Sequence, residues 1–264
     1  MKKYLSLLVS LFIYLTLNNA HAGLLYAVEE STDSLVSFDT NTLTKTVIGS
    51  LGTTFNFGGL AYDQNSDVMY MIDGRGSRSL HTVDRTTGLA TTIGTHGIED
   101  LFGLAFDSSS NTLYASGESP QGLYTLDVNT GQANLVGQPG VGLDGLAYDS
   151  LRDDLVGLYA GPGDLYSIDK NNASSTLLHD GGFVNNNGLT YDYEQDLFWA
   201  IDWSGNLISY DPNSSYNPTI HLSGVGSHDG LTFVGQPSTV SEPTSLAILS
   251  LGLAGLGLSR RRKA

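Results

Sequence analysis

Three polar residues recur at one position of a repeated pattern, each directly before a Gly-Leu pair. They are Asp144, Asn187 and Asp229, in the segments "DGLAYD", "NGLTYD" and "DGLTF". If these segments are equivalent strands, three oxygen-bearing side chains point toward one axis. Carboxylate and amide oxygens are the ligands that Ca²⁺ and Mg²⁺ prefer. Glu99 and Asp100 stand near another copy of the pattern, so the five residues form a candidate site for a divalent cation.

The Gly-Leu pairs belong to an internal repeat with steps of 42–44 residues. Apolar and β-branched segments alternate with turn residues throughout each copy, which is typical of short strands joined by tight turns. Four antiparallel strands repeated at this period predict the blades of a β-propeller. The Gly-Leu segments, each the innermost strand of a blade, are "GLAYD" (59–63), "GLAFD" (103–107), "GLAYD" (145–149), "GLTYD" (188–192) and "GLTFV" (230–234).

The two ends of the repeat determine how many blades are expected. After residue 22 the chain starts on a second strand, "LLYAV" (24–28), and it finishes on a lone first strand, 230–234. Pairing these two fragments closes the ring and removes the open edges of an unclosed array. We therefore predict an all-β fold, a five-bladed β-propeller of four-stranded antiparallel blades, over residues 23–236.

Many aspartates of the repeat are expected to be structural. One set closes the third strand of each blade and a second set closes the first strand, and in both places a carboxylate can accept backbone N–H groups of the following turn. These aspartates are Asp39, Asp84, Asp127, Asp169 and Asp211 in the first set, and Asp63, Asp107, Asp149 and Asp192 in the second.

Composition excludes several classes of function. The chain has no Cys, so it can form neither a disulfide nor a thiolate metal site. Its formal net charge is −15, and half of its few basic residues stand at the two extreme ends. An acidic domain repels phosphate backbones, which argues against nucleic-acid binding. The serines lack the context of a nucleophile elbow, so acyl-transfer catalysis has no support and no catalytic residue is assigned.

The first 22 residues have the pattern of a signal peptide. Lys2 and Lys3 precede an apolar run, and "AHA" ends at Ala22 with small residues at the cleavage positions. We expect the mature protein to begin after Ala22.

The C-terminal end combines a short motif, an apolar stretch and a basic cluster. Residues 237–245 form a linker that contains Ser241, Glu242 and Pro243, and residues 246–264 form an apolar segment ending in Arg260, Arg261 and Arg262. This order resembles the PEP-CTERM sorting signal of Gram-negative bacteria, with Ser in place of the usual first Pro. The resemblance implies a short transmembrane helix, transient anchoring in the inner membrane, an exosortase-type processing enzyme, and delivery to the cell surface or the extracellular space.

The Asn-Gly and Asp-Gly strand starts are also similar to those of gluconolactonase-like propellers, in which such residues hold a catalytic divalent metal. Against this stands a simpler interpretation, that the Asx-Gly pairs only favour the turn into a strand. Three functions therefore remain open. The protein is an exported, non-catalytic propeller that binds extracellular polysaccharide, a surface protein or a small ligand, or a Ca²⁺- or Mg²⁺-dependent hydrolase, or a structural matrix component without a discrete site.

Overall fold

Strands make up nearly all of the regular structure in this protein. The computed structural model describes residues 23–159, 161–181 and 186–235, and for side chains it leaves out Asn186 and Asn187 as well. Within these ranges the helices are two short 3-10 turns, Glu30–Thr32 and Pro212–Ser214. The all-β prediction is confirmed.

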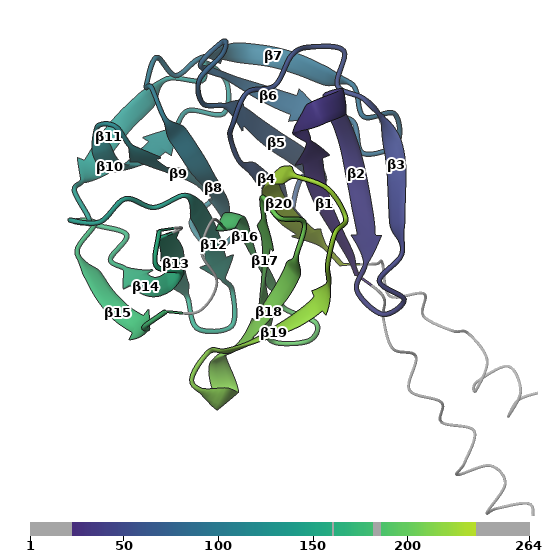
Figure 1. Cartoon of the computed structure of the whole chain (residues 1–264). Helices are drawn as coiled ribbons and strands as arrows, with labels where there is room; N and C mark the ends of the chain where they lie inside the picture. Colours follow the sequence, from purple (N-terminus) through teal and green to yellow (C-terminus); the bar gives the residue numbers. More distant parts are fainter. Residues whose placement is uncertain (1–22, 160, 182–185, 236–264) are drawn as a thin grey trace, which may run out of the picture.

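The strands form five separate antiparallel sheets of four strands each, arranged in a ring (Figure 1). The first blade contains β20 (His228–Val234), β1 (Leu24–Glu29), β2 (Ser34–Asp39) and β3 (Lys45–Ser50). The second contains β4 (Leu60–Asp63), β5 (Val68–Asp73), β6 (Ser79–Val83) and β7 (Ala90–Thr95). The third contains β8 (Leu101–Asp107), β9 (Thr112–Glu118), β10 (Gln121–Leu126) and β11 (Ala133–Gly137). The fourth contains β12 (Gly145–Asp149), β13 (Asp154–Tyr159), β14 (Asp164–Ile168) and β15 (Ser175–His179). The fifth contains β16 (Asn186–Asp192), β17 (Leu197–Asp202), β18 (Leu207–Asp211) and β19 (Asn217–Leu222).

The ring is closed by the pairing of β20 with β1, as the sequence predicts. Leu24 stands opposite Val234 at one end of this pair, and Glu29 stands opposite His228 at the other end. The chain therefore enters the propeller and leaves it on the same face, at the Leu24 end. The opposite face, at the Glu29 end, contains the loops that lead into the innermost strands, and we call it the mouth.

The Gly-Leu repeat has a steric cause. A Cβ added at Gly145 would lie 2.8 Å from the Cβ of Leu189 and 3.0 Å from its backbone nitrogen, on the innermost strand of the next blade. The same contact recurs around the whole ring. Its members are Gly59 with Leu104, Gly103 with Leu146, Gly145 with Leu189, Gly188 with Leu231, and Gly230 with Leu60. Glycine lets neighbouring backbones approach this closely because it has no Cβ.

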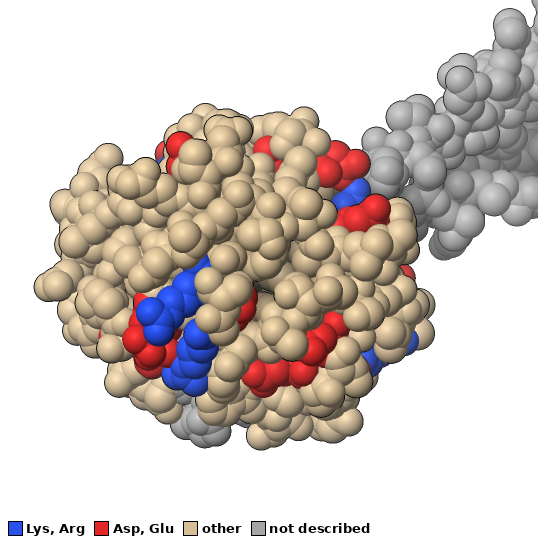
Figure 2. All heavy atoms as spheres, turned by 90° about the horizontal axis from the view of Figure 1, so that it is seen from above, with Lys and Arg blue, Asp and Glu red and all other residues tan. Residues whose placement is uncertain are grey.

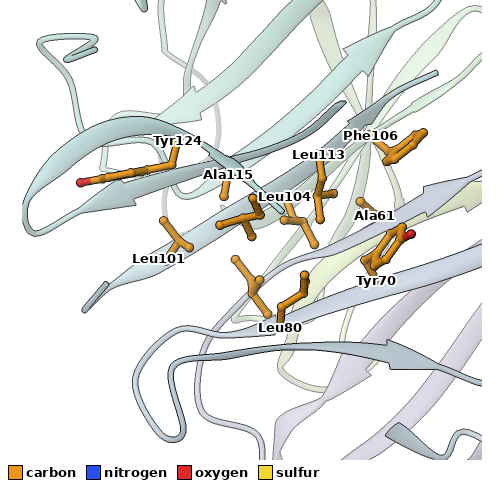
Figure 3. Close-up of a cluster of buried hydrophobic side chains, with 11 residues drawn as sticks. Ala61, Tyr70, Leu80, Leu101, Leu104, Phe106, Leu113, Ala115 and Tyr124 are labelled. Carbon is orange, nitrogen blue, oxygen red and sulfur yellow. The ribbon is translucent and has the colours of Figure 1, made fainter. Parts of the chain in front are cut away.

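Apolar side chains fill the space between adjacent blades. In the cluster between the second and third blades, Leu80 and Tyr70 face Leu104 and Leu113, and every member of the cluster is at most 7% exposed (Figure 3). Comparable clusters lie between the other blades. The core is therefore a series of layers around the ring, and each blade contributes to two of them.

The turn aspartates act as predicted. Asp127 Oδ1 accepts the backbone N–H groups of Asn129 and Thr130, and Asp149 Oδ1 accepts those of Leu151 and Arg152. Every other aspartate of the two predicted sets also accepts at least one backbone N–H from its own turn. These carboxylates stabilise the turns on the face from which the chain ends leave.

The predicted boundaries at both ends concern residues that the structure does not describe. The signal peptide (1–22), the linker (237–245) and the short transmembrane helix with its basic end (246–264) stay predictions in structural terms. Within the described part of the chain, no helix has the length and apolar character needed to cross a membrane.

We expect that Gly145→Ala lowers the free energy of unfolding by about 3 kcal/mol. The added Cβ would press on backbone and Cβ atoms of Leu189, which cannot rotate away. Chemical denaturation of the full chain measures this effect.

Gly140→Ala provides the matched control for this variant. Gly140 has a φ of 78°, and an added Cβ there would meet no atom within 4 Å. This variant should lose only the strain of a left-handed alanine, about 1 kcal/mol. Equal losses for the two variants would mean that the ring does not need the close approach at Gly145.

Candidate functional site: the channel mouth

A cavity of about 70 Å³ lies at the mouth end of the central channel. All five blades, through their strands or the adjoining loops, supply its walls. Its lining residues are Phe57 and Gly58 before β4, Arg75 after β5, Phe102 in β8, Glu118 in β9, Asp144 before β12, Trp203 after β17, and Asp229 in β20.

Asp229 is the most unusual group in the mouth cavity. It is 1% exposed, although a carboxylate normally stays in water unless it is paired. Its Oδ1 accepts a hydrogen bond from the Trp203 indole, with Nε1 at 3.1 Å. Its Oδ2 is buried and has no hydrogen-bond partner. A buried polar atom without a partner destabilises the fold by about 1–3 kcal/mol, and in the described ranges Oδ2 of Asp192 is the other carboxyl oxygen of this kind.

Burial raises the pKa of Asp229 to about 8, because the charged form is poorly solvated there. The charges of Glu30 and Asp144 raise the pKa further, and the charge of Arg75 opposes them. Asp229 is therefore largely protonated at neutral pH. A strongly shifted carboxyl in a cavity is a common property of functional sites.

Arg75 and three aromatic rings form the other wall of the cavity. The Arg75 guanidinium lies 4.2 Å from the ring centroid of Phe57 and 5.0 Å from that of Phe102. Trp203 meets Phe57 edge to face at 5.4 Å, and it remains 45% exposed. An aromatic ring this exposed beside a buried carboxyl is typical of a binding surface rather than of a core.

Two of the predicted metal ligands line the same cavity, and two others form ion pairs with arginines. Asp144 and Asp229 line the same cavity. Asp100 forms an ion pair with Arg75, and Glu99 forms one with Arg78 at 3.1 Å. Asn187 belongs to β16, but its side chain is outside the description, so its proposed role stays a prediction.

A divalent cation would find few protein ligands among the described residues. No group of three or more His, Asp or Glu side chains in these ranges is arranged to hold a metal ion. Asp144 and Asp229 would need Asn187, backbone carbonyls or water to complete a coordination sphere.

Several other acidic residues of the mouth are occupied by local contacts. Asp73 accepts the backbone N–H groups of Gly76 and Ser77, and Asp202 accepts the N–H of Asn206. Glu29 pairs with Lys45 at 2.6 Å. These acids shape the loops. The acids that line the cavity are Glu118, Asp144 and Asp229.

The sequence did not single out Phe57 or Arg75 as cavity residues. Both stand in loops on the mouth face, and Arg75 is one of the few basic residues in the middle of the chain. An aromatic residue before the Gly-Leu pair, as in "FGGL" and "LFGL", was the available signal.

The opposite end of the channel has a second cavity, of about 60 Å³, lined by all five innermost strands. Three of its four lining tyrosines, Tyr62, Tyr148 and Tyr191, donate their hydroxyls to Asp67, Asp153 and Asp196. Each of these three hydroxyls therefore has a hydrogen-bond partner, in contrast to Oδ2 of Asp229 at the mouth.

Basic and acidic side chains adjoin one another on the surface of the domain, and other residues cover most of the face shown in Figure 2. Each basic residue between 23 and 235 forms an ion pair. The basic residues are Lys45, Arg75, Arg78, Arg85, Arg152 and Lys170. The acidic excess of the domain therefore lies in carboxylates without a basic neighbour.

Comparison with known families identifies the C-terminal end. Residues 239–263 match the PEP-CTERM protein-sorting motif. The chain thus carries an export-sorting signal, which implies handling by an exosortase-type system and transient membrane anchoring. No curated protein matches the chain in sequence.

Solved structures confirm the propeller fold. The chain is similar to a chain of a nidogen/laminin complex, with 15% identity, a TM-score of 0.54, and coverage of 81% of this chain and 85% of that one. It is also similar to the PQQ-bound aldose sugar dehydrogenase of Streptomyces coelicolor, with 16% identity, a TM-score of 0.54, and coverage of 81% and 85%. A structural genomics protein of unknown function from Bacteroides thetaiotaomicron shares 16% identity with a TM-score of 0.55, and the match covers 80% of this chain but 61% of that one. At this level of identity the similarity concerns the fold alone.

We expect Asp229→Asn to stabilise the protein relative to wild type, and to do so more strongly at pH 8 than at pH 5. The carboxyl of the unfolded chain ionises near pH 3.8, whereas the folded one keeps its proton up to about pH 8. The folded state binds more protons across this window, so wild-type stability falls as the pH rises. The difference between variant and wild type should grow by about 1.4 kcal/mol per pH unit. Thermal unfolding from pH 5 to 8 measures it.

Asp153→Asn is the control for this pH dependence. Lys170 and Tyr148 hydrogen bonds lower the pKa of the Asp153 carboxyl, so neutralising it should give no gain that increases with pH. A constant difference between Asp229→Asn and wild type from pH 5 to 8 would contradict a protonated Asp229.

Proposed function

We propose that this exported propeller, which carries a PEP-CTERM sorting motif, is a non-catalytic binding module with its ligand site in the mouth cavity. The observation that carries the proposal is the buried Asp229 with its unpartnered Oδ2, beside the exposed Trp203. Folding alone gains nothing from such an oxygen, whereas a bound ligand that forms a hydrogen bond with it would satisfy it.

The position of the chain ends supports this function. Val234, the last residue of β20, lies beside Leu24 on the face opposite the mouth. The sorting motif begins at residue 239, so a chain held by its tail would present that opposite face toward the membrane. The mouth would then face outward, toward extracellular polysaccharide or a surface protein.

A divalent-metal-dependent hydrolase of the lactonase kind is the second candidate, favoured by the presence of Asp144 and Asp229 in one cavity. In this case the purified full chain should contain a divalent ion, and Asp144→Ala should lower its occupancy. Elemental analysis measures both. Metal-free wild-type protein, or unchanged occupancy in the variant, would remove this candidate.

The binding function predicts a loss of surface retention when the mouth is altered. In Gram-negative cells that export and process the protein, a Trp203→Ala, Asp229→Asn double variant should be retained at the surface or in the matrix about thirtyfold less than wild type. The reason is that a central contact is commonly worth about 2 kcal/mol. Quantitative immunoblotting of the cell-associated and released fractions measures it.

Two controls separate binding from sorting. Asp153→Asn, on the face opposite the mouth, should be retained like wild type. A chain that ends at residue 245 lacks the apolar tail and should not be processed, whether or not its mouth is intact. Equal retention of the double variant and wild type would argue against a mouth ligand and would favour a structural matrix role.

A further inference from the structure

The mouth cavity contains a hydrogen-bond acceptor that the protein does not satisfy. Asp229 uses Oδ1 for the Trp203 indole, and Oδ2 is buried in the cavity without a donor. A ligand that presents an N–H or O–H group to the ionised carboxyl would satisfy Oδ2, and a cation bound there would lower the pKa of Asp229 and favour this ionised form.

The charge around the cavity favours a positively charged ligand. Glu118, Asp144 and Asp229 line it, and the charge of Glu30 reaches Asp229 as well. Among the lining residues the single cation is Arg75, and its charge is balanced by the ion pair with Asp100. The Arg75 guanidinium also lies over the rings of Phe57 and Phe102.

The size of the cavity limits the ligand to a small group. Its volume is about 70 Å³. An engineered protein cavity of about 150 Å³ holds one benzene molecule, so this cavity is too small to enclose a six-membered sugar ring. It has room for a few non-hydrogen atoms, which is the size of the end of an alkyl chain with a single polar head group.

The number of acceptors distinguishes between two kinds of cation. Ca²⁺ takes six to eight oxygen ligands, and no three His, Asp or Glu side chains of the described ranges converge in this way. An alkylammonium has three N–H donors and needs far fewer acceptors. Asp144 and Asp229, together with one water or backbone carbonyl, are sufficient for it.

We propose that the mouth cavity binds a protonated primary amine, held by the carboxyl groups of Asp229 and Asp144 and flanked by the Trp203 ring. This inference rests on the proposed binding function and specifies its ligand class. The amine can belong to a free alkylamine or to the side chain of a lysine on a partner protein. Both sources present the same head group on an alkyl stem.

The Trp203 indole gives a direct measurement of binding. It donates to Asp229, so an ammonium group at that carboxyl changes the environment of the ring. The other tryptophan, Trp199, is 1% exposed and belongs to the core, so it contributes a constant background. We suggest titrating the full chain, in mild detergent at constant ionic strength, with n-butylammonium chloride while following tryptophan fluorescence.

We expect saturable binding with a Kd on the order of 1 mM, which corresponds to about 4 kcal/mol for a fragment of this size. Asp229→Asn and Asp144→Asn should each weaken binding at least about tenfold, the loss of one charge-assisted hydrogen bond. Butan-1-ol, which has the same stem without the charge, should not bind detectably. Asp153→Asn, on the opposite face, should bind like wild type.

A second titration distinguishes the two sources of the amine. The probe is lysine acetylated at its α-amino group and amidated at its carboxyl group, which imitates a lysine within a protein chain. Tighter binding of this compound than of n-butylammonium would identify a partner protein as the source. Tighter binding of n-butylammonium would identify a free amine.

Three outcomes would overturn the amine proposal. They are equal binding of butan-1-ol, unchanged binding in Asp229→Asn and Asp144→Asn, and a response to calcium chloride with none to the amine. In the last case the cavity is a binding site for a metal ion. The proposed function is tested separately, because the loss of surface retention in the Trp203→Ala, Asp229→Asn double variant does not depend on which ligand the cavity holds.

Discussion

The close approach of neighbouring innermost strands is the constraint on which the rest of this propeller depends. Each contact places a glycine of one blade against the backbone of a leucine in the next, and the series returns from Gly230 to Leu60. A side chain at any of these glycines would push two blades apart. Because the blades are so close at the axis, the cavities described at the two ends of the channel are small, about 70 Å³ and 60 Å³. The same contact that holds the ring together therefore limits what its mouth can bind.

Ring closure gives the domain two different faces. The β20–β1 pair brings Val234 next to Leu24, so both ends of the chain leave where the turn aspartates lie. Each of those aspartates accepts a backbone N–H of its own turn, as at Asp127 and Asp149, although Oδ2 of Asp192 is buried without a partner. At the mouth, Asp229 accepts the Trp203 indole N–H, and its Oδ2 has no partner. The structural and the functional carboxylates are thus on opposite faces, although they are the same residue type in the same repeat.

The mouth also shows how a protein can keep a destabilising group. Burial of Asp229 raises its pKa to about 8, and the nearby charges of Glu30 and Asp144 act in the same direction. Arg75 is close enough to oppose this shift, but it is paired with Asp100 and stacked on Phe57. The cavity therefore keeps a carboxyl with an unsatisfied oxygen, at a cost in stability that a bound ligand would offset.

The amino-acid sequence by itself determined the fold, because the pattern of one propeller blade lies within a single repeat of 42–44 consecutive residues. The spacing of the Gly-Leu pairs predicted five blades, the fragments 24–28 and 230–234 predicted ring closure, and the turn aspartates could be recognised by their regular positions. Only the tertiary structure decided the chemistry of the mouth. The indole of Trp203 reaches Asp229 from another blade, Arg75 neutralises Asp100, and Oδ2 of Asp229 is left without a partner. Such contacts join side chains from different repeats, and they depend on how closely the blades approach one another. A repeat pattern gives no information about either.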